Sequence, residues 1–202
     1  MFIVFEGIDG CGKSTQVWKL ARYFADLSKY NHVLVTREPY KLREIRNILR
    51  KDEPAETKSE ELTKLFVKDR EEHLKEIIKP ALEKNIIVVC DRYKYSTICY
   101  QAAQGQDIKK LIEIHKNMLV PDFIFILDIP IEIAIKRMKK DNIREKEHKF
   151  EKNPAFLEKV RQNYLKLPAL FPEEKIIILD GSKTIEKIFE EIKICLKNFK
   201  NI

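Results

Sequence analysis

Residues 2–15 of the chain read FIVFEGIDGCGKST and combine a short apolar run with three closely spaced glycines, a lysine and a serine. Gly7 and Gly12, followed by Lys13 and Ser14, match the pattern G-x-x-x-x-G-K-[ST] of a phosphate-binding loop. The apolar run before the match predicts a buried strand, and the residues after it have helical periodicity. Strand, glycine-rich loop and helix in this order disfavour the alternative of an ordinary glycine turn.

The residue types of this loop suit a nucleoside triphosphate with magnesium. Glycines let the backbone turn so that successive N–H groups face phosphate oxygens, and the following helix adds its positive end. Lys13 would reach the β- and γ-phosphates, and the Ser14 hydroxyl would coordinate Mg²⁺. The predicted ATP-binding residues of the loop are Gly7, Ile8, Asp9, Gly10, Cys11, Gly12, Lys13, Ser14 and Thr15.

The rest of the chain alternates short apolar runs with longer amphipathic stretches. The runs are Phe2–Phe5, His32–Thr36, Ile86–Cys90, Phe123–Leu127 and Lys175–Leu179. The amphipathic stretches are Lys13–Lys29, Ser59–Glu83, Gln106–Met118, Ile131–Lys140, Ala155–Lys166 and Thr184–Phe199. Runs that are apolar on both faces are typical of parallel strands covered on both sides by helices. The alternation predicts a three-layer α/β/α fold around a five-stranded parallel sheet, in one domain spanning residues 1–202.

Composition and charge exclude several classes of protein. Of the 202 residues 44% are hydrophobic and 35% charged, which is typical of a folded globular protein. No apolar run approaches the ~20 residues of a membrane helix, and the N-terminal residues lack the basic segment of a signal peptide. The four cysteines form no Cys-x-x-Cys pair, so we expect free thiols and a cytoplasmic protein. The net charge of +7 indicates an anionic partner, either nucleic acid or small phosphates.

Segments outside the loop narrow the class of nucleotide-binding protein. The chain lacks the N-K-x-D motif of GTPases and is shorter than most large ATPases, so a kinase for a small acceptor fits best. TREP at residues 36–39, LFVKDR at 65–70, DRYKYSTICYQ at 91–101 and KFEKNPAFLEKVRQNYLKL at 149–167 resemble the thymidylate kinase family. The similar segments run from residue 2 to about residue 183 in the order and spacing of that family.

The resemblance implies an enzyme that transfers the γ-phosphoryl group of ATP to dTMP, giving dTDP and ADP for dTTP biosynthesis. It also implies Mg²⁺ as cofactor, ATP and dTMP as the small-molecule partners, and a homodimer. The implied dTMP-binding residues are Asp9, Arg37, Phe66, Arg70, Arg92, Ser96, Tyr100 and Gln101. The implied catalytic residues are Lys13, Asp9, Arg92 and Arg144, and the implied metal-binding residues are Ser14 and Asp91.

The resemblance also implies a role for each of these residues. Arg92 would hold the acceptor phosphate, and Phe66 would stack on the thymine ring. Arg70 and Gln101 would bind the polar edge of the base, and Tyr100 would crowd C2′ and disfavour a ribonucleotide. Asp9 resembles the family carboxylate that contacts the sugar 3′-OH, and Asp91 would act on magnesium through water.

The residues themselves support part of this assignment. Asp91 and Arg92 end an apolar run, and open α/β sheets bind ligands beyond the carboxyl ends of their strands. The alternative is a structural ion pair at a strand end. Phe66 lies in an amphipathic stretch, where an aromatic residue is more often part of the core, and Tyr100 alone would be interpreted as packing.

A charged stretch, KRMKKDNIREKEHKFEK at residues 136–152, predicts either a solvated helix end or a basic lid at about residues 137–152. In one subclass of thymidylate kinases an arginine follows the aspartate of the phosphate loop, but here Gly10 occupies that position. The resemblance therefore implies the subclass whose lid supplies the arginine. Arg144 is the first candidate for the transferring phosphoryl group, and Arg137 occupies the place of an arginine that packs over adenine.

Two other interpretations remain open besides a dTMP kinase. After TREP the family usually continues with glycines, whereas this chain continues with Tyr40-Lys41-Leu42-Arg43, and Lys41 could replace an arginine that touches the acceptor phosphate. This change favours a broader deoxynucleoside monophosphate kinase that accepts dUMP or dGMP. From another class, the net charge would fit a nucleic-acid-dependent ATPase, although no basic stripe with interleaved aromatic residues is present and no nucleic acid partner is expected. A silent nucleotide-binding subunit is disfavoured by the retained Lys13, Ser14 and Arg92.

Overall fold

The computed structural model describes residues 1–51, 53–54, 56–140 and 153–197. Its strands form one sheet in the order β2-β3-β1-β4-β5, and every neighbouring pair is parallel. The strands are β1 (Phe2–Glu6), β2 (Val33–Arg37), β3 (Ile87–Asp91), β4 (Phe123–Asp128) and β5 (Ile176–Asp180). The predicted five-stranded parallel sheet is confirmed, and the observed strands differ from the predicted runs by one residue at most ends.

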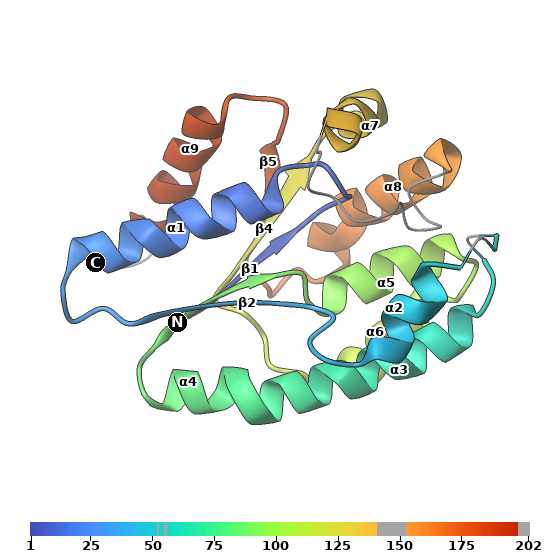
Figure 1. The fold of residues 1–202 in the computed structure, drawn as a ribbon, viewed down its shortest axis with the longest axis horizontal. Helices are drawn as coiled ribbons and strands as arrows, with labels where there is room; N and C mark the ends of the chain where they lie inside the picture. The colour runs from blue at the N-terminus through green and yellow to red at the C-terminus, as the bar shows by residue number, and fades with distance from the viewer. Residues whose placement is uncertain (52, 55, 141–152, 198–202) are drawn as a thin grey trace.

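Helices cover both faces of this sheet. They are α1 (Lys13–Leu27), α2 (Arg43–Leu49), α3 (Ser59–His73), a π-helical turn η1 (Leu74–Ile78), α4 (Lys79–Glu83), α5 (Lys94–Ala103), α6 (Ile108–His115), α7 (Ile131–Lys140), α8 (Pro154–Leu170) and α9 (Ile185–Lys197). Figure 1 shows α1 and α9 together on one face, with α3, α4, α5 and α6 on the other and α8 next to α5. The three-layer α/β/α prediction is therefore confirmed.

Two helices were not predicted from the sequence, and each has a physical reason. Almost every residue of α5 is buried, so its sequence has no polar face and no amphipathic period. Helix α2 has only seven residues, which is too short for a periodic signal. The single predicted stretch Ser59–Glu83 is helical throughout, because η1 joins α3 to α4 without a break.

The carboxyl ends of the strands gather charged side chains at one edge of the sheet. The last residues of the five strands are Glu6, Arg37, Asp91, Asp128 and Asp180. The central strands β1, β3 and β4 supply much of the apolar core, whereas the edge strands β2 and β5 are partly exposed. Because parallel strands all end at the same edge, these charged groups converge where a doubly wound sheet binds its ligands. In the part of the chain that the structure describes, no helix has both the length and the apolar character needed to cross a membrane.

Candidate active site

The phosphate loop follows β1 in a conformation that requires glycine. Gly7 has φ +131°, and a Cβ built on it would lie 2.6 Å from the carbonyl oxygen of Leu127 in β4. Gly10 has φ +79°, and its Cβ would lie 2.7 Å from the carbonyl oxygen of Ala134 in α7. Both values of φ are strained for residues with side chains, and both contacts involve backbone that cannot move aside easily. The position after Asp9 therefore has no room for an arginine while α7 lies against the loop.

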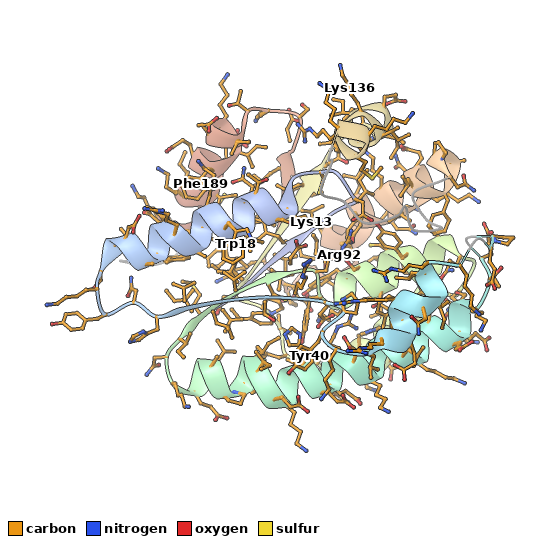
Figure 2. The ribbon with its side chains drawn as sticks, in the orientation of Figure 1. Lys13, Trp18, Tyr40, Arg92, Lys136 and Phe189 are labelled. Carbon is orange, nitrogen blue, oxygen red and sulfur yellow. The ribbon has the colours of Figure 1, made fainter. Side chains whose placement is uncertain are left out.

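Lys13 and Ser14 lie where the loop becomes α1. The Lys13 side chain is only 6% exposed, and its Nζ donates to the carbonyl oxygens of Gly7 at 3.1 Å and Ile8 at 2.9 Å. The ammonium group is thus held inside the curl of the loop. Figure 2 shows Lys13 at the start of α1 and Arg92 after β3.

Ser14 and Asp91 are brought together although 77 residues separate them in sequence. The Ser14 hydroxyl donates to Asp91 Oδ2 at 2.7 Å, whereas Asp91 Oδ1 is buried and has no hydrogen-bond partner in the part of the chain that the structure describes. A hydroxyl and a carboxylate oxygen are ligands that Mg²⁺ prefers, and Mg²⁺ usually binds through one or two protein groups plus substrate phosphates. Among the described residues no group of three or more His, Cys, Asp or Glu side chains could hold a metal. The pair therefore fits a magnesium ion that is held mainly by a nucleotide.

We expect Asp91→Asn to raise the Mg²⁺ concentration that gives half-maximal activity by about 10-fold, because groups that orient the ligands of a metal contribute this much to its affinity. The measurement is the initial rate as a function of Mg²⁺ at fixed nucleotide concentrations. Asp26→Asn, which removes an exposed carboxylate, is the control for the change in net charge. An unchanged Mg²⁺ dependence in Asp91→Asn would contradict the assignment of Asp91.

Arg92 connects the end of β3 to the phosphate loop. Its Nη2 forms an ion pair with Asp9 Oδ1 at 2.8 Å, and its Nη1 donates to Ser96 Oγ at 2.9 Å. The Tyr100 ring lies 5.4 Å from the guanidinium carbon, and the Tyr100 hydroxyl donates to Asp9 Oδ2 at 3.4 Å. Burial opposes the charge of Arg92, but Asp9 and the neighbouring tyrosine and glutamate groups outweigh it and raise the pKa of Arg92 well above its ordinary value. Asp9, Arg92, Ser96 and Tyr100, all predicted from the sequence, thus form one cluster.

Helices α3 and α5 pack side by side and carry the predicted base-binding residues. Phe66 and Arg70 lie one turn apart on α3, and Phe66 is half-buried. On α5, Thr97 accepts a hydrogen bond from Arg70 Nη2 at 2.9 Å, and Gln101 lies one turn further along. Gln101 Nε2 donates to the carbonyl oxygen of Ser59 at 2.8 Å, which fixes the amide orientation and leaves Oε1 buried without a partner among the described residues.

The Arg70 guanidinium is held by a buried network that the sequence did not predict. Its side chain is 1% exposed, and its Nε donates to Glu38 Oε2 at 2.7 Å. Its Nη1 is 2.9 Å from Nε2 of His115, whose Nδ1 donates to the carbonyl oxygen of Leu111 at 2.6 Å. Nε2 of His115 must therefore accept from Arg70, so the imidazole is neutral. Burial, together with the positive charge of Arg70, lowers the pKa of His115 to about 3.

This neutral histidine makes stability depend on pH. In the unfolded chain a histidine has a pKa of about 6.5, so between pH 6.5 and about 3 the unfolded state binds a proton that the folded state does not. Stability must therefore fall as the pH decreases, and from pH 7 to pH 5 His115 should cost about 2 kcal/mol of unfolding free energy. Urea unfolding at both pH values should show that His115→Gln loses about that much less than the wild type. The exposed His32→Gln is the control, and parallel losses in His115→Gln and the wild type would contradict this interpretation.

A cavity of about 450 Å³ lies beside the phosphate loop, between the start of α1 and the segment that joins β5 to α9. Cys11 and Thr15 line it on the loop side, and Gly181 with residues 183–186 line the other side. Arg137 of α7 spans the two sides, since its Nη1 donates to the carbonyl oxygens of Gly181 at 2.9 Å and Cys11 at 3.5 Å. The segment at Gly181 was missed from the sequence, although one of only five glycines directly after a predicted strand could have signalled it.

Comparisons with known proteins identify the relatives of this chain. The family model for thymidylate kinase matches residues 5–192. The chain belongs to the thymidylate kinase family. A probable thymidylate kinase of Pyrococcus horikoshii is 39% identical over 98% of this chain and 96% of its own length. A thymidylate kinase of Thermosipho africanus is 39% identical over 96% of both chains. A crystal structure of thymidylate kinase from Ehrlichia chaffeensis matches with a TM-score of 0.73 and 29% identity over 98% of each chain.

Membership of the thymidylate kinase family makes this chain an enzyme of nucleotide metabolism, in a class that transfers phosphoryl groups between small-molecule substrates. Such transfer generally uses a divalent metal, in agreement with the free oxygen of Asp91. The matched region includes the phosphate loop, the Arg92 cluster and α8. Nothing in the comparisons favours a nucleic-acid-dependent ATPase.

The loop after TREP is held by a carboxylate that the sequence analysis did not assign. Asp69 of α3 is buried and accepts hydrogen bonds from the backbone N–H groups of Tyr40, Lys41 at 2.9 Å and Leu42 at 2.8 Å. The Tyr40 ring also stacks on His73, with ring centroids 4.7 Å apart. The loop therefore has a defined conformation without glycines.

The side chains of Lys41 and Arg37 differ in their contacts with the rest of the protein. Lys41 Nζ forms ion pairs with Glu76 at 2.7 Å and Glu72 at 3.2 Å, so the structure directs it to α3 and η1 instead of favouring the suggested contact with an acceptor phosphate. Arg37, the last residue of β2, pairs with Asp91 in the sheet, but its side chain is exposed and has no hydrogen bond or ion pair with the described residues. Arg144 and most of the predicted lid lie outside the described residues, which include only residues 137–140 of it.

Proposed function

We propose that this protein transfers the γ-phosphoryl group of ATP to dTMP, giving dTDP and ADP, with Mg²⁺ bound together with the nucleotide. A single observation supports dTMP as the substrate that receives the phosphoryl group. On the neighbouring helices α3 and α5, one hydrogen-bond donor and one hydrogen-bond acceptor have no partner among the described residues. Arg70 has five N–H groups, of which four go to Glu38, His115, Thr97 and the Tyr93 carbonyl, so one on Nη1 has no partner among the described residues. The unpartnered acceptor is Gln101 Oε1.

This donor and acceptor match the polar edge of thymine. Thymine presents the acceptor O4 next to the donor N3–H, whereas cytosine presents an amino donor at the same position. Phe66 lies one turn before Arg70 and offers a ring on which the base can stack. A site that hydrogen-bonds one edge rejects the reversed edge strongly, because its buried polar groups would lose their partners. The Tyr100 ring beside Arg92 is proposed to crowd C2′ and so to disfavour ribonucleotides.

The donor nucleotide is proposed to bind across the phosphate loop, with its adenine in the cavity beside Arg137. Lys13 would leave the carbonyl oxygens of Gly7 and Ile8 to bind phosphate oxygens, because a charge-assisted bond to phosphate is stronger than one to a carbonyl. Ser14 and Asp91 would hold the Mg²⁺ ion, which neutralises phosphate charge when bound. Arg144 is proposed as the arginine that contacts the transferring phosphoryl group, because the phosphate loop has Gly10 and not an arginine after Asp9.

In the proposed reaction Arg92 holds the acceptor phosphate beside the phosphate loop, and Asp9 orients Arg92 and faces the sugar. An oxygen of the dTMP phosphate attacks the γ-phosphorus, and the bond from that phosphorus to the β,γ-bridging oxygen breaks. The protein forms no covalent bond with the phosphoryl group in this reaction. Its main contributions are to position the substrates and to stabilise negative charge through Lys13 and Arg92.

The test is ADP release measured over a panel of nucleoside monophosphates with ATP and Mg²⁺. We expect the highest kcat/KM with dTMP and at least about 100-fold less with dCMP or CMP, since a reversed hydrogen-bonding edge is rejected this strongly or more. Equal or better turnover of CMP, GMP or AMP would contradict the proposal. Turnover of dUMP or dGMP comparable to that of dTMP would instead establish the broader deoxynucleoside monophosphate kinase suggested by the sequence Tyr40–Arg43. A homodimer and a cytoplasmic location remain proposals from the family resemblance.

A further inference from the structure

Glu6, the last residue of β1, has a buried carboxylate that contacts Ser96 in the cluster formed by Asp9, Arg92, Ser96 and Tyr100. Its Oε1 accepts hydrogen bonds from the backbone N–H groups of Tyr93 at 2.7 Å and Ser96 at 3.2 Å. Its Oε2 accepts from the hydroxyls of Ser96 at 2.6 Å and Tyr164 at 2.9 Å. Burial raises the pKa of Glu6, while these bonds and the charge of Arg92 act in the opposite direction. An ionised carboxylate has about four acceptor positions, and the four donors occupy all of them.

The first consequence concerns the backbone of Arg92. This residue has φ +73°, a left-handed conformation that costs energy for a residue with a side chain. Its N–H donates to the carbonyl oxygen of Phe5 at 2.9 Å, and the next N–H, that of Tyr93, donates to Glu6. The strained turn is therefore held on both sides by β1. Glu6 also accepts from the N–H groups of Tyr93 and Ser96 at the start of α5, and Ser96 N–H shares its bond with the Tyr93 carbonyl oxygen, so Glu6 fixes the start of the helix together with the turn.

The second consequence concerns the guanidinium group. The hydroxyls of Ser96 and Tyr164, whose oxygens lie 2.9 Å apart, each donate to Glu6 Oε2 and accept from Arg92 Nη1, the latter at 2.9 and 3.3 Å. Asp9 accepts from Nη2 on the other branch. The orientation of the guanidinium thus depends on two hydroxyls, and these accept from Arg92 because each donates its proton to the Glu6 carboxylate.

We propose that Glu6 is a positioning residue for the acceptor phosphate, acting through Ser96, Tyr164 and the strained Arg92 turn. The proposal rests on the proposed function, in which Arg92 binds that phosphate. Glu6 itself is separated from the substrate by these groups, so it is not a catalytic residue. Tyr164 comes from α8, which Arg161 also ties to Asp128 at the end of β4 by two hydrogen bonds of 2.6 and 2.9 Å. The position of Arg92 is therefore set by β1, α5 and α8 together.

Glu6→Gln tests the proposal because it keeps the size of the side chain and reverses one hydrogen bond. If the amide nitrogen replaces Oε2, it donates to the Ser96 and Tyr164 hydroxyls, and their protons turn toward Arg92. If it replaces Oε1, it faces the N–H of Tyr93, and two donors meet. Either orientation disturbs Arg92, whereas the phosphate loop keeps its own contacts.

The measurement is the dissociation constant of dTMP and of thymidine, which lacks the phosphate, together with the KM values for dTMP and ATP. We expect Glu6→Gln to weaken dTMP binding and to raise its KM by about 10-fold, while thymidine binding and the KM for ATP change by less than about twofold. Parallel weakening of dTMP and thymidine would overturn the proposal, since it would indicate a general loss of structure. Unchanged dTMP binding would overturn it as well.

Glu174 provides a matched control. Its carboxylate is also largely buried and bonds the same first turn of α5, through Lys94 at 2.7 Å and the Tyr95 hydroxyl, but it does not touch Arg92 or Ser96. Glu174→Gln should destabilise the fold without changing the ratio of thymidine to dTMP dissociation constants. A similar change of this ratio in Glu174→Gln and Glu6→Gln would overturn the positioning role.

Tyr164→Phe keeps the test decisive if Glu6→Gln does not fold. It removes one of the two hydroxyls that join Glu6 to Arg92, and we expect about threefold weaker dTMP binding with unchanged thymidine binding. No change in this ratio would overturn the proposal. If the wild type prefers another nucleoside monophosphate, the proposed function fails, and the same ratio measured with that monophosphate and its nucleoside still decides the role of Glu6.

Discussion

Lys13→Ala is expected to lower kcat by about 10³-fold or more. It removes the only positively charged side chain of the phosphate loop, which would stabilise the negative charge on the transferring phosphoryl group. The side chain is nearly buried and its ammonium is bonded to two carbonyl oxygens of its own loop, which it would exchange for phosphate oxygens when the nucleotide binds, before the reaction begins. Preorganised charge of this kind stabilises a transition state without reorganisation at the moment of reaction. The KM for dTMP should change far less than kcat, since Lys13 belongs to the donor side.

The experiment measures kcat and both KM values under saturating Mg²⁺. Lys19→Ala is the matched control: Lys19 lies on the same helix, is partly exposed, and forms a 3.8 Å ion pair with the exposed Glu186. It should leave kcat within about twofold, because exposed ion pairs contribute little. Thermal unfolding of both variants shows whether α1 is intact. A Lys13→Ala enzyme with kcat within 10-fold of the wild type would mean that another cation supplies this charge.

Arg70→Met is expected to lower the free energy of unfolding by about 3–5 kcal/mol, because it leaves the buried carboxylate of Glu38 without its cation. Arg70 and Glu38 are 1% and 6% exposed, and the guanidinium also satisfies Thr97, the Tyr93 carbonyl and His115. Methionine fills a similar volume but donates no hydrogen bond. Such a loss is a large part of the ~5–15 kcal/mol by which a domain of this kind is stable.

Urea unfolding at pH 7 measures this loss directly. Arg22→Met is the control, since Arg22 pairs with Asp26 on the exposed face of α1 and its loss should cost less than about 1 kcal/mol. The double variant Arg70→Met/Glu38→Gln should recover part of the loss, because the buried negative charge is removed together with its partner. A single variant as stable as the control would contradict the network around Arg70. Discrimination between dTMP and dCMP should also fall in Arg70→Met, under the proposed base recognition.

The fold was predictable because its signals are local. Each predicted strand is a short apolar run, and the strand before Gly7 is followed at once by the glycines, Lys13 and Ser14 that define the phosphate loop. Helix α5 was not predictable in this way, because burial on all sides removes the polar face on which periodicity depends. The residues of its DRYKYSTICYQ segment were assigned by family resemblance instead.

The sequence by itself determined the phosphate loop, the alternation of strands and helices, and the family to which the chain belongs. Only the tertiary structure showed that Glu6 supports Arg92, that His115 accepts from Arg70, and that Asp69 holds the loop after TREP. These contacts of Asp69, His115 and Glu6 join residues that are 27–158 positions apart in sequence. A lone glutamate or histidine in a sequence carries no sign of its partner, because the partner is chosen by the packing of β1, α3, α5 and α6 and not by spacing along the chain.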